Sequence, residues 1–209
     1  MKLAVIGASA GVGLELVLQL VERGHFVTTL SRSVEAIPDH ANIRKIRGSS
    51  LNDADVSQAI DGAEAILVTL GTGMSTKATG LYPGSANAIL RALEKAAGKP
   101  LLIVLTGFGA GDSWNYNSLV MKALFRLLLK DVYAEKTRME HILSTGYPNS
   151  MFVRPGRLTN GALTKKYRVV TTLNEQTRVG AISRKDVAHF LAEQAEHPSF
   201  IGQYPALSD

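Results

Sequence analysis

Three glycines stand close together near the start of the chain, at positions 7, 11 and 13 of the stretch VIGASAGVG. A residue without a Cβ lets the backbone turn sharply and lets a phosphate approach it closely. We expect Gly7 to let the chain leave a strand, Gly11 to leave room for a pyrophosphate, and Gly13 to let a helix pack against a sheet. The spacing, read as G-x-x-x-G-x-G or as G-x-x-G-x-x-G with Ala10 in the middle place, favours a dinucleotide-binding turn over a purely structural one. The residues of this turn expected to contact the cofactor are Gly7, Ser9, Ala10, Gly11, Val12 and Gly13.

The stretch TLSRS, residues 29–33, adds a second group of polar side chains. A site that prefers NAD places a carboxylate at this point, where it binds the 2′-hydroxyl of the ribose. Here no acid precedes Glu35. Instead, Ser31, Arg32 and Ser33 offer a guanidinium and two hydroxyls, which suit a 2′-phosphate. We therefore expect NADP(H) rather than NAD(H), the alternative being that Arg32 is a solvated surface arginine.

These side chains need a framework that brings them together, and the chain alternates short apolar runs with helix-like runs. The expected strands are residues 2–6, 26–30, 43–48, 65–70, 101–106 and 151–155, with a further one in YRVVTTL. The expected helices follow the glycines, start at Asn52 or Asp53, cover 85–98 and about 118–145, and start again at Ser183, where Asp186 completes a capping box. This alternation predicts an α/β fold, a Rossmann-like doubly wound parallel sheet. We expect one domain over residues 1–209, with a small substrate-side cap around 156–182.

Composition limits the classes of function. The net charge of +5 is spread along the chain, without the clustered lysines, arginines and aromatics of a nucleic-acid surface. The chain has no cysteine, and no apolar run approaches the roughly 18 residues of a membrane span. We therefore expect a cytoplasmic protein that binds neither nucleic acid nor a membrane. The histidines lack the spacing of metal ligands, so no metal is expected.

Motifs along nearly the whole chain are similar to those of one superfamily. They are IGASAGVG, VTTLSRS, LGTG at 70–73, LTGFGAGDSW, KTRMEHIL at 136–143, VRPG at 153–156 and SRKDVAHFL at 183–191. On these motifs the chain resembles an atypical short-chain dehydrogenase/reductase. Within that superfamily it is most similar to the biliverdin-IXβ reductase/flavin reductase family, and more loosely to the NmrA-like proteins.

The resemblance implies roles for residues that follow the strand ends, where ligands of open α/β sheets bind. Gly71 and Thr72 would lie beside the adenosine ribose and the pyrophosphate, and Thr106 and Gly107 under the nicotinamide. Lys136 matches the superfamily's active-site lysine, which usually holds the hydroxyls of the nicotinamide ribose, and it forms the expected catalytic set with Thr106. The remaining implied cofactor contacts are Ser50, Leu51, Leu70, Pro155, Gly156 and Arg157, the last three beside the carboxamide.

Two positions depart from the pattern of a carbonyl-reducing member. That chemistry needs a tyrosine four residues before the lysine, and the residue there is Val132. Tyr133 is next to it, but one residue along a helix turns a side chain by about 100°, so we expect Tyr133 to point elsewhere. Gly107 stands near the usual place of a catalytic serine. Both departures argue against a proton relay to a ketone or a sugar.

Reduction of a flavin needs no such relay, and the resemblance implies hydride transfer directly to a planar ring. We expect the ring to rest on Phe108, Trp114 and Tyr116, with packing of these aromatics onto the core as an equal alternative. The expected substrates are FMN, riboflavin, a bilin or a quinone, bound by a monomer or a dimer. The competing interpretations are a non-enzymatic NADP sensor of the NmrA type and a carbonyl reductase or sugar-nucleotide epimerase.

Overall fold

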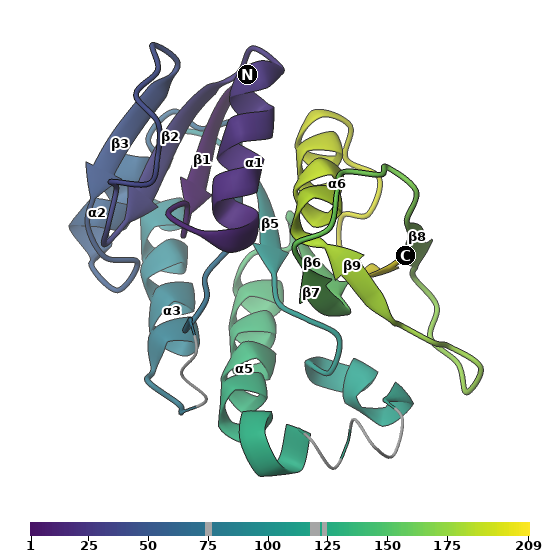
Figure 1. The fold of residues 1–209 in the computed structure, drawn as a ribbon. Helices are drawn as coiled ribbons and strands as arrows, with labels where there is room; N and C mark the ends of the chain where they lie inside the picture. The colour runs from purple at the N-terminus through teal and green to yellow at the C-terminus, as the bar shows by residue number, and fades with distance from the viewer. Residues whose placement is uncertain (74–76, 118–121, 123–124) are drawn as a thin grey trace.

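The computed structural model describes residues 1–73, 77–117, 122 and 125–209, which form a sheet with helices on both faces (Figure 1). The strand order is β3-β2-β1-β4-β5-β6-β10-β8, and neighbouring strands run parallel except β10 and β8. Its strands are β1 Lys2–Ile6, β2 Phe26–Ser31, β3 Ile43–Arg47, β4 Ala65–Val68, β5 Leu101–Leu105, β6 Ser150–Pro155, β8 Arg168–Val170 and β10 Ala206–Ser208. Two further strands, β7 (Arg157–Thr159) and β9 (Ala181–Ser183), pair with each other.

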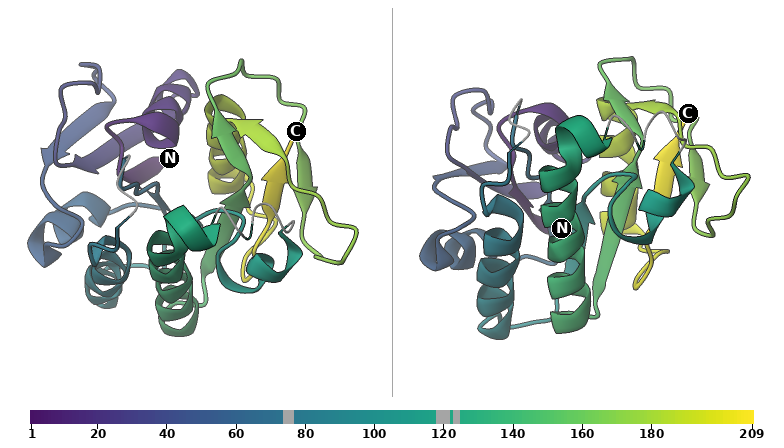
Figure 2. Two further views of the ribbon diagram at one scale, coloured as in Figure 1. Left: turned by 60° about the horizontal axis from the view of Figure 1, so that its bottom comes forward. Right: turned by 90° about the horizontal axis from the view of Figure 1, so that it is seen from below.

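Helices cover both faces of the sheet. Helices α1 (Gly11–Glu22) and α6 (Arg184–Glu196) lie on one face, and α2 (Asp53–Ile60), α3 (Leu81–Glu94) and α5 (Lys130–Gly146) lie on the other. Figure 2 shows α3 and α5 standing side by side, and they pack against each other. The expected α/β fold with a doubly wound, mostly parallel sheet is confirmed.

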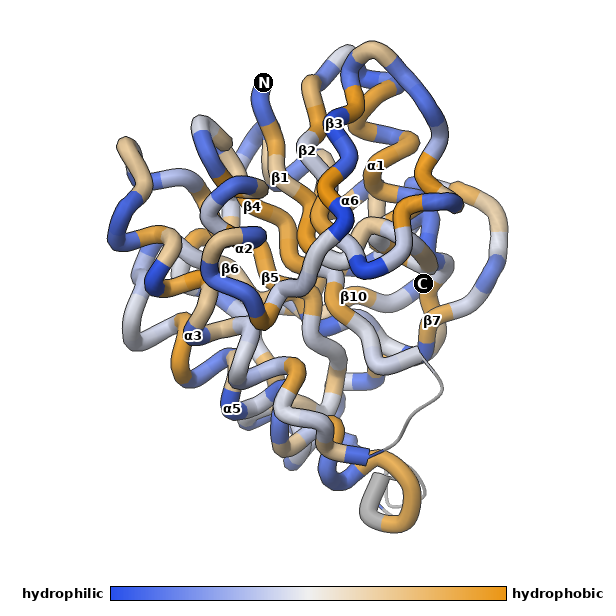
Figure 3. Tube along the Cα trace, turned by 90° about the vertical axis from the view of Figure 1, so that its left-hand side faces the viewer, coloured by the Kyte–Doolittle hydropathy of each residue, from blue (hydrophilic) through white to orange (hydrophobic). Residues whose placement is uncertain are grey.

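Strand β1 shows why its apolar run favours this arrangement. Successive side chains of a strand point to opposite faces. Leu3 and Val5 therefore pack with α1 and α6, whereas Ala4 and Ile6 pack with α2, α3 and α5. A strand covered on both faces needs apolar residues at every position, and the central strands are largely orange in the hydropathy view (Figure 3).

Two helix starts that the sequence predicted are confirmed. The side chain of Asn52 accepts hydrogen bonds from the backbone N–H groups of Ala54 and Asp55, which begins α2. The hydroxyl of Ser183 accepts from the N–H of Asp186 at 3.0 Å, and the Asp186 carboxylate accepts from that hydroxyl at 2.8 Å. These reciprocal bonds fix the start of α6, which reaches the site described below.

The middle helices differ from the prediction. Helix α3 begins at Leu81 rather than 85, because Pro83 stands in the first turn, where its missing N–H costs nothing. The helix expected over 118–145 begins as α5 at Lys130, after a π-helix at Phe125–Leu129 and a 3₁₀ helix at Gly111–Tyr116. The part of that prediction on residues 118–121 and 123–124 lies outside the described residues. The three-residue strands β7, β9 and β10 were not predicted, since so few residues carry no readable alternation.

The order of the strands reverses between β1 and β4. From β1 the chain winds outward through β2 and β3, and from β4 it winds the other way through β5 and β6. Loops therefore diverge at the carboxyl ends of β1 and β4 and leave a crevice, which is where open α/β sheets bind ligands. Within the part of the chain that the structure describes, no helix combines the length and the apolar character needed to cross a membrane.

Candidate cofactor site

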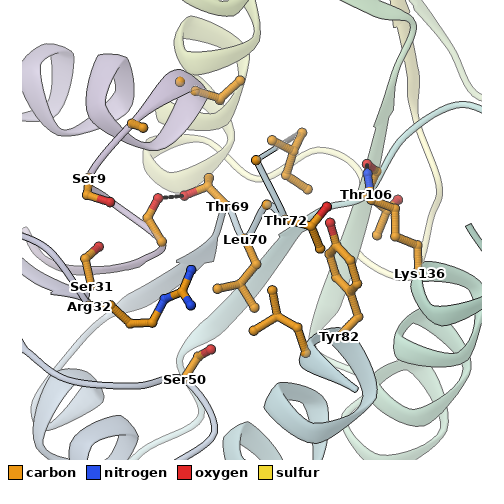
Figure 4. Close-up of a pocket in the computed structure, with 18 of the residues that line it drawn as sticks. Ser9, Ser31, Arg32, Ser50, Thr69, Leu70, Thr72, Tyr82, Thr106 and Lys136 are labelled. Carbon is orange, nitrogen blue, oxygen red and sulfur yellow. Dashed lines mark hydrogen bonds between the residues drawn. The ribbon is translucent and has the colours of Figure 1, made fainter. Parts of the chain in front are cut away.

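A cavity of about 1040 Å³ opens at this reversal point (Figure 4). It runs from the loop after β1, past the ends of β2 and β4, to the end of β5 and the first turns of α5. Most of the residues singled out from the sequence border it. They are Gly7, Ser9, Ala10, Gly11, Val12, Ser31, Arg32, Ser33, Ser50, Leu51, Leu70, Gly71, Thr72, Thr106, Lys136 and Pro155.

The glycine turn forms one end of the cavity, and its geometry excludes side chains. A Cβ on Gly13 would lie 2.1 Å from the backbone oxygen of Gly7, and Gly7 itself has a φ of +95°. Gly13 does not border the cavity but lets α1 pack onto the turn, as expected. The space over Gly11 is open, since the nearest atoms to a Cβ there are Nε and Cδ of Arg184, at 3.7 and 3.9 Å.

Helix α1 begins at this turn without an anionic or side-chain cap. Its first turn carries no acidic residue, and Ala10, which precedes it, makes no side-chain hydrogen bond. The first N–H groups of the helix therefore face the cavity together with the positive end of the helix dipole. An anion such as a pyrophosphate fits this end.

The three polar residues at the end of β2, Ser31, Arg32 and Ser33, have different contacts. The buried hydroxyl of Ser31 accepts from the N–H of Ala8 and donates to the carbonyl of Leu30, both at 2.8 Å, so it fastens the glycine turn. The hydroxyl of Ser33 donates to Glu35 at 2.7 Å. The guanidinium of Arg32 points into the cavity (Figure 4). Arg32 is thus the side chain of this stretch that is placed to meet a ligand charge.

Lys136 and Thr106 meet at the other end of the cavity. The Lys136 ammonium donates to the carbonyl oxygen of Thr106 at 2.6 Å and lies 5.6 Å from the ring centre of Tyr82 and 5.1 Å from that of Tyr133. Burial lowers the pKa of Lys136 to about 8, and the nearby carboxylate of Glu140 opposes that shift. The lysine is consequently protonated at neutral pH and gives up its proton in mildly alkaline solution.

The expectation that Tyr133 points away from the site is wrong. Tyr133 borders the cavity beside Val132, and a Cβ on Gly107 would lie 3.0 Å from its hydroxyl and 3.5 Å from Nζ of Lys136. Residues three and four positions apart share one helix face, so both Val132 and Tyr133 face the site with Lys136. Burial raises the pKa of Tyr133 to about 12, which keeps the phenol protonated.

Several predicted contacts do not border the cavity. Gly107 lies behind Tyr133 and Lys136, while Gly156 and Arg157 lie beyond Pro155 at its edge. A Cβ on Gly156 would lie 2.1 Å from the backbone oxygen of Gly180, so this glycine serves close packing of two backbone segments.

The predicted aromatic wall is also placed elsewhere. Phe108 is buried, and Trp114 and Tyr116 are half-buried on the 3₁₀ helix, away from the cavity. Ser113 fixes this segment, since it accepts from the N–H of Gly109 and donates to the carbonyl of Ala110. Apolar and aromatic side chains that the sequence analysis did not select as cofactor or substrate contacts also border the cavity: Leu129, Val132, Leu158, Tyr82 and Tyr133.

Arg184, at the start of α6, is another residue of the cavity that sequence reasoning missed. Its Nη1 donates to the side-chain oxygen of Asn160 at 2.7 Å, and its Nε stands over Gly11. In the motif SRKD, Arg184 directly follows the N-cap residue Ser183, so its place at the start of a helix could be predicted. Its contact with Gly11 could not, because the two residues are far apart in the sequence. The other cavity residues not predicted are Leu30, Gly48, Ser49, Thr69, Gly73, Leu81 and Leu105.

This arrangement can be compared with known proteins. The sequence model of the family described as NAD(P)H-binding matches residues 7–198. The chain belongs to the NAD(P)H-binding family. The open space over Gly11 and the uncapped start of α1 fit the phosphates of such a dinucleotide.

Relatives of this NAD(P)H-binding protein agree in fold. ChuY of Escherichia coli O157:H7, an anaerobillin reductase, is 26% identical with a TM-score of 0.82 over 100% of this chain and 97% of its own. A short-chain dehydrogenase/reductase of Veillonella parvula, solved in complex with NADP, has a TM-score of 0.84 at 19% identity over 100% and 94%. The resemblance is confirmed to this extent: the chain belongs to the NAD(P)H-binding family, and it shares its fold with an anaerobillin reductase and with a short-chain dehydrogenase/reductase.

A curated relative matches over a shorter stretch. The 3-beta-hydroxysteroid dehydrogenase of Mycolicibacterium neoaurum is 35% identical over 68 residues, which are 32% of this chain and 19% of that protein. The match therefore spans about a fifth of that relative's length and about a third of this chain.

Proposed function

We propose that the protein is an NADPH-dependent oxidoreductase that passes a hydride directly to a flavin or a similar planar acceptor. The observation that carries this proposal is a single cavity bordered at one end by the glycine turn and at the other by Lys136, Tyr82 and Tyr133. A bound nicotinamide would supply the hydride. The chain's own part is to hold two rings face to face and keep water away, which positions rather than activates the reactants.

Different residues at the Lys136 end of the cavity would contact the cofactor and the acceptor. In this proposal Lys136 binds the ribose hydroxyls, and its hydrogen bond to the carbonyl of Thr106 supports that role. Leu129, Val132 and Leu158 offer an apolar wall for a planar acceptor. ChuY, an anaerobillin reductase, supports including a bilin among the acceptors, beside FMN, riboflavin and quinones.

The preference for NADPH is part of the proposal and rests on Arg32. The first acid after β2, Glu35, forms an ion pair with Arg47 and accepts from Ser33. These contacts lower the pKa of Glu35 to about 2 and occupy its oxygens with neighbours on the protein surface. A 2′-phosphate would instead meet the guanidinium of Arg32, which can pair with two phosphate oxygens.

The test is the rate of NADPH oxidation with FMN, riboflavin, biliverdin or a quinone, and with no acceptor, each repeated with NADH. We expect acceptor-dependent turnover that favours NADPH. Tight NADPH binding without turnover on any acceptor would contradict the proposal and favour a non-enzymatic NADP sensor of the NmrA type.

The position of Tyr133 favours a second candidate, reduction of a carbonyl. In that reaction a hydride goes to the carbonyl carbon and the Tyr133 phenol donates its proton to the carbonyl oxygen, with Lys136 beside it. Tyr133→Phe separates the candidates. It should lower carbonyl reduction at least about 100-fold, since a positioned general acid contributes that much, and leave direct reduction of a flavin nearly unchanged.

A further inference from the structure

A buried ion pair lies directly behind the Lys136 end of the cavity. Glu140 on α5 and Arg154 on β6 have side chains that are 4% and 3% exposed. Two bonds join them: Nη2 of Arg154 donates to Oε2 of Glu140 at 2.7 Å, and its Nε donates to Oε1 at 3.0 Å. This two-bond geometry fixes the Glu140 carboxylate in one orientation.

The pair is connected to the cavity through Thr106. The Thr106 hydroxyl donates to Oε1 of Glu140 at 2.6 Å, while its carbonyl accepts the Lys136 ammonium at 2.6 Å. Glu140 thus holds the side chain of the residue whose backbone holds Lys136. Both bonds come from a single residue at the end of β5, so a change in the orientation of Thr106 would also move the lysine.

The pair has a second connection, away from the cavity. Nη1 of Arg154 donates to Oδ1 of Asp112 at 2.5 Å, and the Asp112 side chain is 71% exposed on the 3₁₀ helix. The Arg154 guanidinium also stacks over the ring of Tyr204, at 4.5 Å. Asp112 and Glu140 are therefore two acidic partners of one arginine, and Glu140 is the one that reaches Thr106.

Stability alone is a poor reason for this arrangement. A buried ion pair contributes little net stability compared with apolar side chains of the same size, because both charges lose their water. Here the charged pair is hydrogen-bonded to Thr106, which in turn binds Lys136, and these are the two residues expected to be catalytic.

We propose that Glu140 is a positioning residue, which holds Thr106 through its hydroxyl and thereby sets the place and the charge of Lys136. The part of this inference that concerns turnover rests on the proposed oxidoreductase function. The part that concerns Lys136 itself does not.

Glu140 favours the protonated, positively charged form of Lys136. Other titratable groups near the ammonium are Tyr82 from α3 and Tyr133 from α5, whose phenols remain neutral because burial raises the pKa of each to about 12. Arg154 lies behind Glu140 and repels a positive lysine. Among the residues that the structure describes, Glu140 is the carboxylate that acts on the pKa of Lys136, and it favours the protonated form against the effect of burial. Removing its charge should lower the pKa of Lys136, so that the lysine loses its proton at a lower pH.

The test is an NMR titration of the Lys136 side chain in cofactor-free protein, with the resonance assigned from Lys136→Met. In Glu140→Gln, which keeps the shape and loses the charge, we expect the pKa of Lys136 to fall by about one unit. The alkaline limb of kcat should move to lower pH by the same amount. Asp112→Asn is the matched control: it removes the other acidic partner of Arg154 and should leave the titration of Lys136 unchanged.

The NMR titrations decide the inference about Glu140, and the turnover assay separates it from the proposed function. An unchanged Lys136 titration in Glu140→Gln would overturn the inference, and so would an equal shift in Asp112→Asn. If Glu140→Gln does not fold, the double variant Glu140→Gln/Arg154→Met removes both buried charges, and a smaller downward shift of the Lys136 pKa is expected there, because the repulsion from Arg154 is lost as well. The absence of a downward shift in that variant would overturn the inference. A shift in the titration combined with no turnover by the wild-type protein on any acceptor would refute the proposed function and leave the role of Glu140 standing.

Discussion

The two ends of the cavity are built by different means. The end beside α1 consists of backbone, of glycines that leave space, and of two arginines, Arg32 from the loop after β2 and Arg184 from the start of α6. The end beside α5 consists of side chains from β5, α5 and β6, locked together by the buried bonds of Thr106, Lys136 and Glu140. One end uses local geometry to accept an anion, and the other uses long-range contacts to hold a cation.

This difference predicts how each end responds to substitution. At Gly7 and Gly13 the glycine turn has no room for an added atom, so a single methyl group there should disrupt it. The arginines that border the cavity project into solvent-accessible space, so their loss should remove a contact without disturbing the fold. Substitutions at the two kinds of position therefore test the comparison directly.

The largest effect is expected for Gly13→Ala. The added Cβ would lie 2.1 Å from the backbone oxygen of Gly7 and 2.6 Å from the hydroxyl of Thr69, so the turn or the helix must shift. We expect NADPH affinity to fall more than about 100-fold and the free energy of unfolding to fall by at least about 2 kcal/mol. Fluorescence titration and denaturant unfolding measure the two.

Gly98→Ala provides the control for that substitution. Nothing lies within 4 Å of a Cβ at Gly98, so both affinity and stability should stay near those of the wild-type protein. A Gly13→Ala protein that folds and binds NADPH normally would show that the turn is not the tight element described above.

The local end of the site is the one that could be predicted from the sequence. The glycine spacing, the apolar strands and the caps at Asn52 and Ser183 each depend on residues within one or two turns of each other, so short windows of sequence carry them. Arg32 was predicted for the same reason, since it directly follows a recognisable strand.

The rest of the site, which includes Arg184 at the α1 end and the whole α5 end, depends on contacts that no short window of sequence contains. Arg184 meets Gly11 across most of the chain, and Glu140 reaches Thr106 from 34 residues away. Tyr133 could have been placed correctly, because its spacing of three residues from Lys136 puts both on one face of a helix. For Phe108, Trp114 and Tyr116 the sequence left a substrate wall and core packing equally open, because composition alone does not distinguish the two. The structure buries Phe108 and leaves all three outside the lining of the cavity.

An intermediate effect is expected for Arg32→Ala, confined to one cofactor. Losing a charged hydrogen-bonding partner of a phosphate costs about 1.5–3 kcal/mol, or roughly 10- to 100-fold in affinity. We expect this loss for NADPH and little change for NADH, which lacks the 2′-phosphate. Arg44→Ala removes the same charge from an exposed position on β3 and should affect neither cofactor. Equal losses for NADPH and NADH in Arg32→Ala would contradict the role of the guanidinium at the 2′-phosphate.

The smallest effect is expected for Arg184→Ala. Unlike Arg32→Ala, this substitution should affect NADPH and NADH alike. Nε of Arg184 stands 3.7 Å from the Cβ position of Gly11, over the start of α1, where both cofactors would place the same pyrophosphate. The side chain is partly solvated and already bonded to Asn160, so its removal should weaken NADPH and NADH equally, by about 3- to 10-fold. Lys185→Ala removes a charge from the next, exposed position and should change neither affinity. A loss limited to NADPH would instead place Arg184 at the 2′-phosphate together with Arg32. The phosphates would then lie differently in the cavity from the arrangement that the open space over Gly11 favours.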